Sequence, residues 1–169
     1  MSSRTFALIF GIAYLGAGLL GLLPGMLTPP PGDAPALRIQ AMNGMLFGLF
    51  HVNLLHSLVH LAIGAWGLAA YAGWSEPRLY ARCLALLYGV LAVMGLIPGL
   101  STLFGLVPLH GHDVWLHLGT AAVAAWFGFR AERSERRRLP GERRRAAAAY
   151  VRNERRSGLD DRRKAPAAA

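Results

Sequence analysis

The chain has 169 residues, of which 54% are hydrophobic and only 16% are charged, whereas about a quarter of a typical soluble domain is charged. Four of the eighteen Lys and Arg residues lie in residues 1–129 and fourteen lie in residues 130–169. Uncharged runs of 37 residues (39–75) and 30 residues (83–112) exclude an ordinary soluble fold, and the single cysteine, Cys83, excludes a disulfide scaffold.

Four segments are long and apolar enough to cross a bilayer. A spanning helix needs about 20 mostly apolar residues, because no water in the hydrocarbon satisfies free backbone groups. In chain order these segments are Phe6–Leu23, Asn53–Tyr71, Arg78–Ile97 and Asp113–Phe129. A cleaved signal peptide is the alternative for the first segment, but its apolar stretch exceeds the usual core of about 7–15 residues and lacks a small-x-small cleavage site.

The distribution of cations predicts the orientation of the segments. Four crossings place seventeen of the eighteen Lys and Arg residues on one side and leave only Arg38 on the other. Three or five crossings would separate the cationic groups. The positive-inside rule therefore predicts four transmembrane helices with both termini in the cytoplasm.

Short phrases recur along the chain in the same order. The sequence of Gly21–Gly25 returns with one change at Gly95–Gly99, and Leu46–Leu49 returns at Leu103–Leu106. His60-Leu61 recurs as His117-Leu118, at the same offset of 57 residues as the second phrase. Asn53 and Asp113 stand where helix N-caps are expected. This order predicts two parallel-repeat helical hairpins, related by a pseudo-two-fold axis along the membrane normal.

Three strings of the chain resemble a known family. Residues 46–61, 103–108 and 113–118 are similar to the bacterial four-helix membrane family catalogued as domain of unknown function 4383. The resemblance covers residues 4–130 and implies the same topology in a bacterial inner membrane, with no assigned activity. The family pattern has Pro at the position of His51 and Asn at that of Ser57. The matching polar positions are Asn53, His56, His60, Asp113 and His117.

The same five polar residues are the candidate site. Asn53, His56 and His60 follow one face of the predicted second helix, and Asp113 and His117 follow one face of the fourth. A polar face is costly in lipid, so the two faces should turn inward and meet. The simplest interpretation is that these side chains hydrogen-bond between helices and cap helix ends, with ~0.6 kcal/mol per contact.

Two other functions fit the same residues. His56 and His60 present two nitrogens one turn apart and His117 can add a third, so a metal or haem site is the alternative hypothesis. The motif lacks the Glu of a zinc hydrolase and has no accompanying Cys or Met pair. The second of these functions is a pathway for protons or a small solute, lined by His60, His117 and Asp113. His110 and His112 fall in a predicted solvated loop, where adventitious metal binding is expected.

The final segment is strongly basic. Residues 131–169 are predicted to form a disordered or partly helical cytoplasmic tail that contacts anionic lipid headgroups, at about 1 kcal/mol per cation near the surface. The candidate lipid-binding residues are Arg136, Arg137, Arg138, Arg143, Arg144 and Arg145. Nucleic acid is a weaker candidate, since only Tyr150 can stack on a base. Competition between anionic vesicles and an oligonucleotide would distinguish the two partners.

Together these patterns predict an all-α, integral membrane four-helix bundle over residues 1–130 and a basic tail over residues 131–169. The predicted function is that of a non-enzymatic packing or interaction module, because no nucleophile triad, phosphate-binding Gly loop or pair of carboxylates suited to acid–base catalysis is present. No cofactor is expected. The alternative is a metal- or haem-binding redox or transport component that uses the membrane histidines.

Overall fold

The computed structural model describes residues 1–130 and contains four α-helices in this part of the chain. The predicted tail and its arginine clusters lie outside the described residues. The helices are α1 (Ser3–Gly21), α2 (Leu54–Ala72), α3 (Pro77–Leu96) and α4 (His112–Ala125). Helices α1, α2 and α3 are long and apolar enough to span a membrane. The four predicted helices are therefore confirmed, with ends that differ by a few residues.

Helix α4 is shorter than the other three. It has 14 residues and continues as the five-residue π-helix η2 (Trp126–Arg130). The chain from His112 onward therefore keeps a helical course to Arg130, although only part of it is α-helical.

The helix ends follow from local sequence. Asn53 caps α2 as predicted, because its Oδ1 accepts a hydrogen bond from the His56 backbone N–H at 3.0 Å. Gly73, at φ +94°, ends α2 in the left-handed conformation that glycine adopts without strain. The predicted cap at Asp113 is wrong: Gly111 precedes the first helical residue of α4, and Asp113 lies inside the first turn.

A small sheet stands between α1 and α2. After the short 3-10 helix η1 (Pro24–Met26), strands β1 (Leu27–Thr28), β2 (Gly44–Leu46) and β3 (Phe50–Val52) pair antiparallel in the order β1-β2-β3. Leu27 pairs with Leu46, and Gly44 pairs with Val52. The all-α prediction therefore needs this correction. Each strand is too short for a sequence pattern to reveal it.

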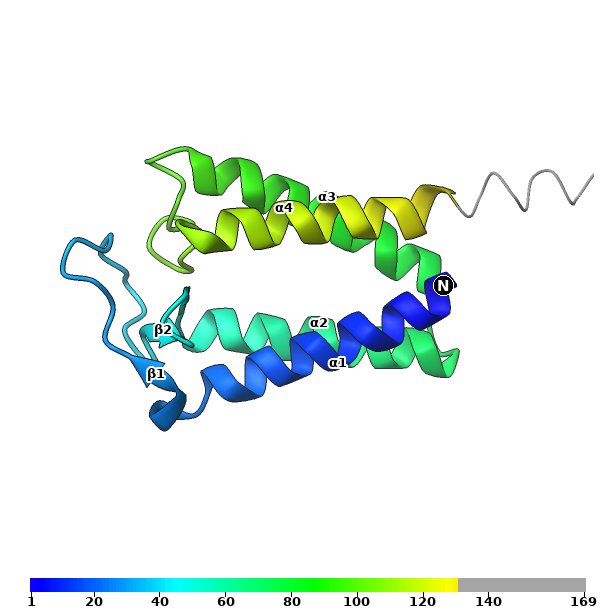
Figure 1. The fold of residues 1–169 in the computed structure, drawn as a ribbon, viewed down its shortest axis with the longest axis horizontal. Helices are drawn as coiled ribbons and strands as arrows, with labels where there is room; N and C mark the ends of the chain where they lie inside the picture. The colour runs from blue at the N-terminus through cyan, green and yellow to red at the C-terminus, as the bar shows by residue number, and fades with distance from the viewer. Residues whose placement is uncertain (131–169) are drawn as a thin grey trace, which may run out of the picture. The chain divides into compact units, whose positions relative to one another are not determined.

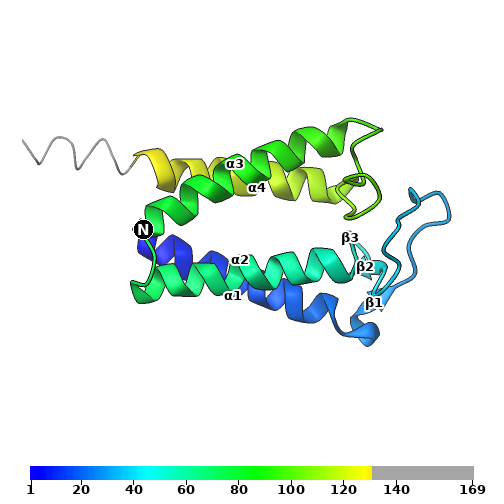
Figure 2. The same ribbon diagram turned by 180° about the vertical axis from the view of Figure 1, so that it is seen from behind.

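The helices pack as two antiparallel pairs. Helix α1 lies along α2, and α3 lies along α4 (Figures 1 and 2). Residues 22–53 and 97–111, called the loop end below, connect the helices of each pair at one end (Figure 1). The start of α1, the turn between α2 and α3, and the end of α4 lie at the opposite end.

Glycines bring α1 and α2 into backbone contact. A Cβ atom on Gly67 would stand 2.7 Å from Gly11 Cα, and one on Gly64 would stand 2.6 Å from the Leu15 backbone nitrogen. Such small-residue contacts between membrane helices allow close van der Waals packing. Between the two pairs the core is aromatic: the Phe6 ring stacks on Phe127 at 5.2 Å and tilts against Tyr80 at 6.1 Å.

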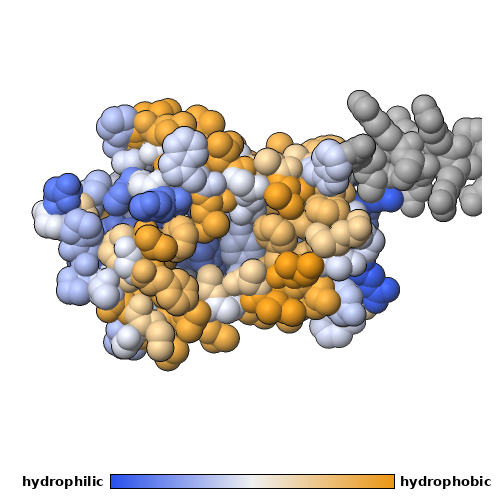
Figure 3. All heavy atoms as spheres, viewed as in Figure 1, coloured by the Kyte–Doolittle hydropathy of each residue, from blue (hydrophilic) through white to orange (hydrophobic). Residues whose placement is uncertain are grey.

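The outer surface of the helices is largely apolar. Large hydrophobic side chains such as Ile12, Leu86 and Trp115 are more than half exposed, whereas the polar residues of α2 and α4 other than the exposed His112 are buried. Figure 3 shows broad apolar areas over both helix pairs, with hydrophilic residues at the loop end and also at the opposite end. This distribution inverts that of a soluble protein and suits a lipid environment.

A buried polar cluster as candidate functional site

All five residues of the predicted cluster are buried. Asn53 is fully buried, Asp113 and His117 are each 2% exposed, and His56 and His60 are below 9%. They come from the start of α2 and the start of α4, next to the loop end. The structure therefore places these polar groups inside the helical unit, as their helical spacing predicts.

Asn53 connects the two helix pairs directly. Its side-chain nitrogen donates to the Leu106 carbonyl oxygen at 2.7 Å and to the Ile39 carbonyl oxygen at 3.2 Å, while its oxygen caps α2. A buried amide with both of its ends used in this way stabilises one particular arrangement of the surrounding backbone. Asn53 is thus both a cap and a link between loops.

The three histidines lie close together and are joined by two tyrosines. The ring centroids of His56 and His60 are 4.5 Å apart, and those of His56 and His117 are 6.4 Å apart. Tyr14 of α1 packs against His60 at 5.2 Å, and Tyr88 of α3 packs against His117 at 5.0 Å. All four helices therefore contribute to one polar and aromatic cluster.

Hydrogen bonding inside the cluster is sparse. The Tyr14 hydroxyl donates to Thr120 Oγ1 at 3.4 Å, a long bond between α1 and α4. In contrast, His56 Nδ1, Ser57 Oγ, Asp113 Oδ2 and His117 Nδ1 are buried with no hydrogen-bond partner. Such atoms call for enclosed water or for protons shared within the cluster.

Within residues 1–130, no group of three or more His, Cys, Asp or Glu side chains is arranged to hold a metal ion. The two unpartnered histidine nitrogens are the feature that keeps the metal or haem alternative a hypothesis.

Tyr14 and Tyr88 were not among the residues predicted from the sequence. They are 74 residues apart, the same offset that relates Gly21–Gly25 to Gly95–Gly99. Applying the 74-residue offset to the residues that precede Gly21 and Gly95 would have paired Tyr14 with Tyr88. Tyr14 packs against His60 and Tyr88 packs against His117. These two histidines are related by the 57-residue offset.

Comparison with known proteins places the chain in one family. No curated protein and no solved structure matches it significantly. A family model described as Domain of unknown function (DUF4383) matches residues 4–130, which is most of the chain. The chain therefore belongs to the DUF4383 family.

Proposed function

We propose that this protein is a non-enzymatic, four-pass protein of the bacterial inner membrane that serves as a packing or interaction module. The single observation that carries the proposal is the inverted distribution of side chains: large apolar residues cover the helices, and the polar cluster is buried between them. In lipid, buried polar contacts between helices supply specificity that apolar packing alone does not. The cluster then holds the two hairpins in one arrangement.

The burial pattern supports an internal repeat. Six of the seven buried residues of α2 have a buried α4 residue 57 positions later, and the seventh, Ala70, corresponds to the half-buried Phe127 of η2. The pairs are His56 and Asp113, Ser57 and Val114, His60 and His117, Ile63 and Thr120, Gly64 and Ala121, and Gly67 and Ala124. Four of the six buried residues of α1 have a buried α3 residue 74 positions later, including Tyr14 and its counterpart Tyr88.

The loops add a second sign of repetition. Phe47 and Gly48 have φ of +56° and +67°, and Phe104 and Gly105 have φ of +60° and +87°. In both phrases the backbone N–H of the last leucine donates to the carbonyl oxygen of the first, at 3.1 and 3.2 Å. The recurring Leu-Phe-Gly-Leu phrase thus makes a similar turn twice, with left-handed Phe and Gly in both copies. In the second copy Leu103, at φ +45°, is left-handed as well.

The charges favour one orientation for these hairpins. The start of α1 and the turn between α2 and α3, which lie at one end, carry Arg4, Arg78 and Arg82. The loop end carries Arg38 alone. By the positive-inside rule, both termini lie in the cytoplasm and the loop end faces outward. The tail residues remain the proposed contact with anionic lipids.

Alanine substitution of the cluster histidines tests the proposed packing role. His60→Ala and His117→Ala are expected to lower the melting temperature of the detergent-purified protein, because each removes a buried ring packed against a tyrosine. Loss of a buried side chain of this size costs about 2 kcal/mol. The control is His112→Ala, an exposed histidine of α4.

An optical spectrum and elemental analysis of the same preparations separate packing from the metal or haem alternative. A colourless preparation whose metal content does not depend on His60 or His117, together with the lowered melting temperature, supports the packing role. A Soret band, stoichiometric metal lost with either residue, or an unchanged melting temperature contradicts it.

A further inference from the structure

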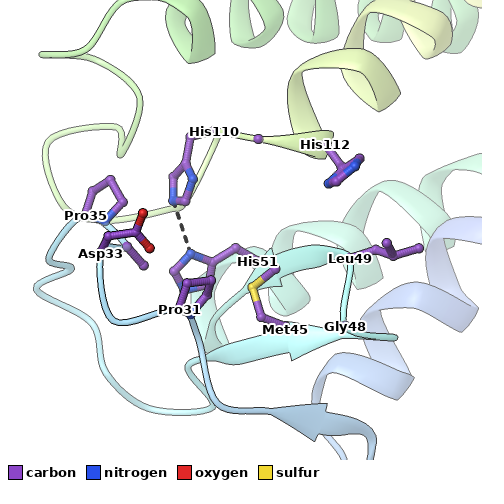
Figure 4. A pocket seen from close by; sticks show the side chains of 11 residues that line it. Pro31, Asp33, Pro35, Met45, Gly48, Leu49, His51, His110 and His112 are labelled. Atoms are coloured by element: carbon purple, nitrogen blue, oxygen red, sulfur yellow. Dashed lines mark hydrogen bonds between the residues drawn. The ribbon is translucent and has the colours of Figure 1, made fainter.

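A second group of histidines lies at the loop end, outside the helices. His51 is the middle residue of β3, and His110 lies just before α4, so the two come from different hairpins. His51 Nδ1 and His110 Nε2 are 3.2 Å apart, and the rings meet nearly edge to face. Figure 4 shows the two rings pointing toward each other, with the Asp33 carboxylate nearby.

A chain of hydrogen bonds fixes which nitrogen of His51 carries the proton. It starts at the Leu37 carbonyl oxygen, which can only accept, so the Gln40 side chain must present its nitrogen there, at 2.7 Å. Gln40 Oε1 then accepts from Asn43 Nδ2 at 2.9 Å, which turns Asn43 Oδ1 toward His51 Nε2 at 2.7 Å. His51 Nε2 therefore carries the hydrogen, and Nδ1 is left with a lone pair.

This arrangement is that of a metal-binding histidine in its free form. A ligating histidine typically donates its second ring N–H to an oxygen acceptor, which fixes the tautomer and the ring orientation. Asn43 supplies that acceptor for His51. His110 Nε2, the neighbouring nitrogen, is then the donor to His51 Nδ1.

The spacing and the surroundings suit an ion between the rings. Two nitrogens at about 2.0–2.1 Å from a tetrahedral ion stand about 3.3 Å apart, close to the 3.2 Å of the hydrogen-bonded pair. An ion would therefore lie to one side of the line that joins the nitrogens, and it would bind both once their hydrogen bond is broken and the rings tilt toward it. Both rings border an open cavity of about 380 Å³ that Asp33 and His112 also line. The cavity leaves room for water ligands, and Asp33 is the one carboxylate among the residues that line it.

Both imidazoles are kept neutral. Burial lowers the pKa of His51, and the neighbouring His110 lowers it further. Burial also lowers the pKa of His110. At neutral pH neither ring therefore carries the second proton that would make it a cation, although His110 Nε2 holds its own ring hydrogen in the bond to His51.

We propose that His51 Nδ1 and His110 Nε2 chelate a divalent transition-metal ion of the Zn²⁺, Cu²⁺ or Ni²⁺ class at the mouth of this cavity, with water in the remaining positions. On binding, the His110 ring proton moves from Nε2 to Nδ1 through solvent, so no net charge is lost from the ring. The ion links the sheet of the first hairpin to the loop of the second. The site adjoins the helical cluster, because the His51 backbone hydrogen-bonds to the His56 side chain, but its two proposed ligand nitrogens lie outside the group of His56, His60 and His117.

Zn²⁺ titration of the full chain tests the site. The protein is purified in detergent through a tag without histidine, and binding is measured by competition with a chromophoric chelator. The wild-type protein is expected to bind one Zn²⁺, and His51→Ala and His110→Ala are each expected to weaken binding at least about tenfold. His112→Ala is the matched control, because His112 lines the same cavity but is exposed. Its affinity should equal that of the wild type.

Copper provides a readout that needs no variant. The electron paramagnetic resonance spectrum of one equivalent of Cu²⁺ on the wild-type protein should show coupling to two imidazole nitrogens, reduced to one in His110→Ala. No saturable binding, a single coupled nitrogen in the wild type, or a loss in His112→Ala as large as in His110→Ala overturns the proposal. None of these outcomes depends on the number of membrane crossings, so the site and the proposed function can fail separately.

Discussion

Gly67→Val is expected to destabilise the protein by about 3 kcal/mol, the upper end of the usual range for overpacking a close contact. A Cβ at this position would lie 2.7 Å from Gly11 Cα and 2.9 Å from the Ala7 carbonyl oxygen, both backbone atoms of α1. Backbone cannot rotate away as a flexible side chain can, so α1 would have to separate from α2. The melting temperature of the detergent-purified variant measures the effect.

Gly16→Val is the matched control for that substitution. Gly16 lies in the middle of α1, and a Cβ there meets no atom within 4 Å. Both changes replace a helical glycine with valine, so differences in intrinsic helix propensity cancel. A melting temperature near that of the wild type is expected for Gly16→Val. Equal losses in both variants would show that the α1–α2 backbone contact has no special importance.

Asn53→Ala is expected to cost about 2–4 kcal/mol, a loss comparable to that of Gly67→Val. Removing a helix N-cap costs about 1 kcal/mol, and leaving a buried carbonyl oxygen without its donor costs about 1–3 kcal/mol more. Asn53 supplies both interactions, since its oxygen caps α2 and its nitrogen reaches the Leu106 carbonyl. Thermal unfolding in detergent is the measurement.

Asn53→Ser separates the two contributions of Asn53. A serine hydroxyl can still accept from the His56 backbone N–H, but it is too short to donate to Leu106 as the amide does. We expect Asn53→Ser to lie between the wild type and Asn53→Ala in stability. If Asn53→Ser melts like the wild type, the link to Leu106 adds nothing. If Asn53→Ala also melts at the wild-type temperature, the role assigned to Asn53 is wrong.

The helices could be predicted from the sequence because hydropathy alone defines them. Uncharged stretches of about 20 residues have few alternatives to a helix when water is absent. The inward face of α2 was also readable, because Asn53, His56 and His60 are spaced at three and four residues on an apolar background. For these features, the local sequence pattern and the apolar environment predict the same structure.

Features that depend on contacts between distant segments could not be predicted. Strands of two or three residues exist only through pairing with their neighbours, so the sheet has no signature of its own. Strands β2 and β3 pair across the turn at Phe47 and Gly48, but β1 pairs with β2 across the long segment 29–43. The hydrogen-bond chain from Leu37 to His110 joins residues far apart in sequence. Asp113 resembles a cap in sequence, but α4 begins earlier, after Gly111 at φ +69°.

The topology of the chain in a bacterial membrane is the most direct test of the account. Reporter fusions that are active on only one side would be placed before Met1, in the turn at Ser75, after Ala169 and in the loop at Asp33. Cytoplasmic signals from the first three positions and an outward signal from Asp33 are predicted. Signals from Met1 and Ala169 on opposite sides, or recovery of the intact chain in the supernatant after ultracentrifugation without detergent, would contradict it.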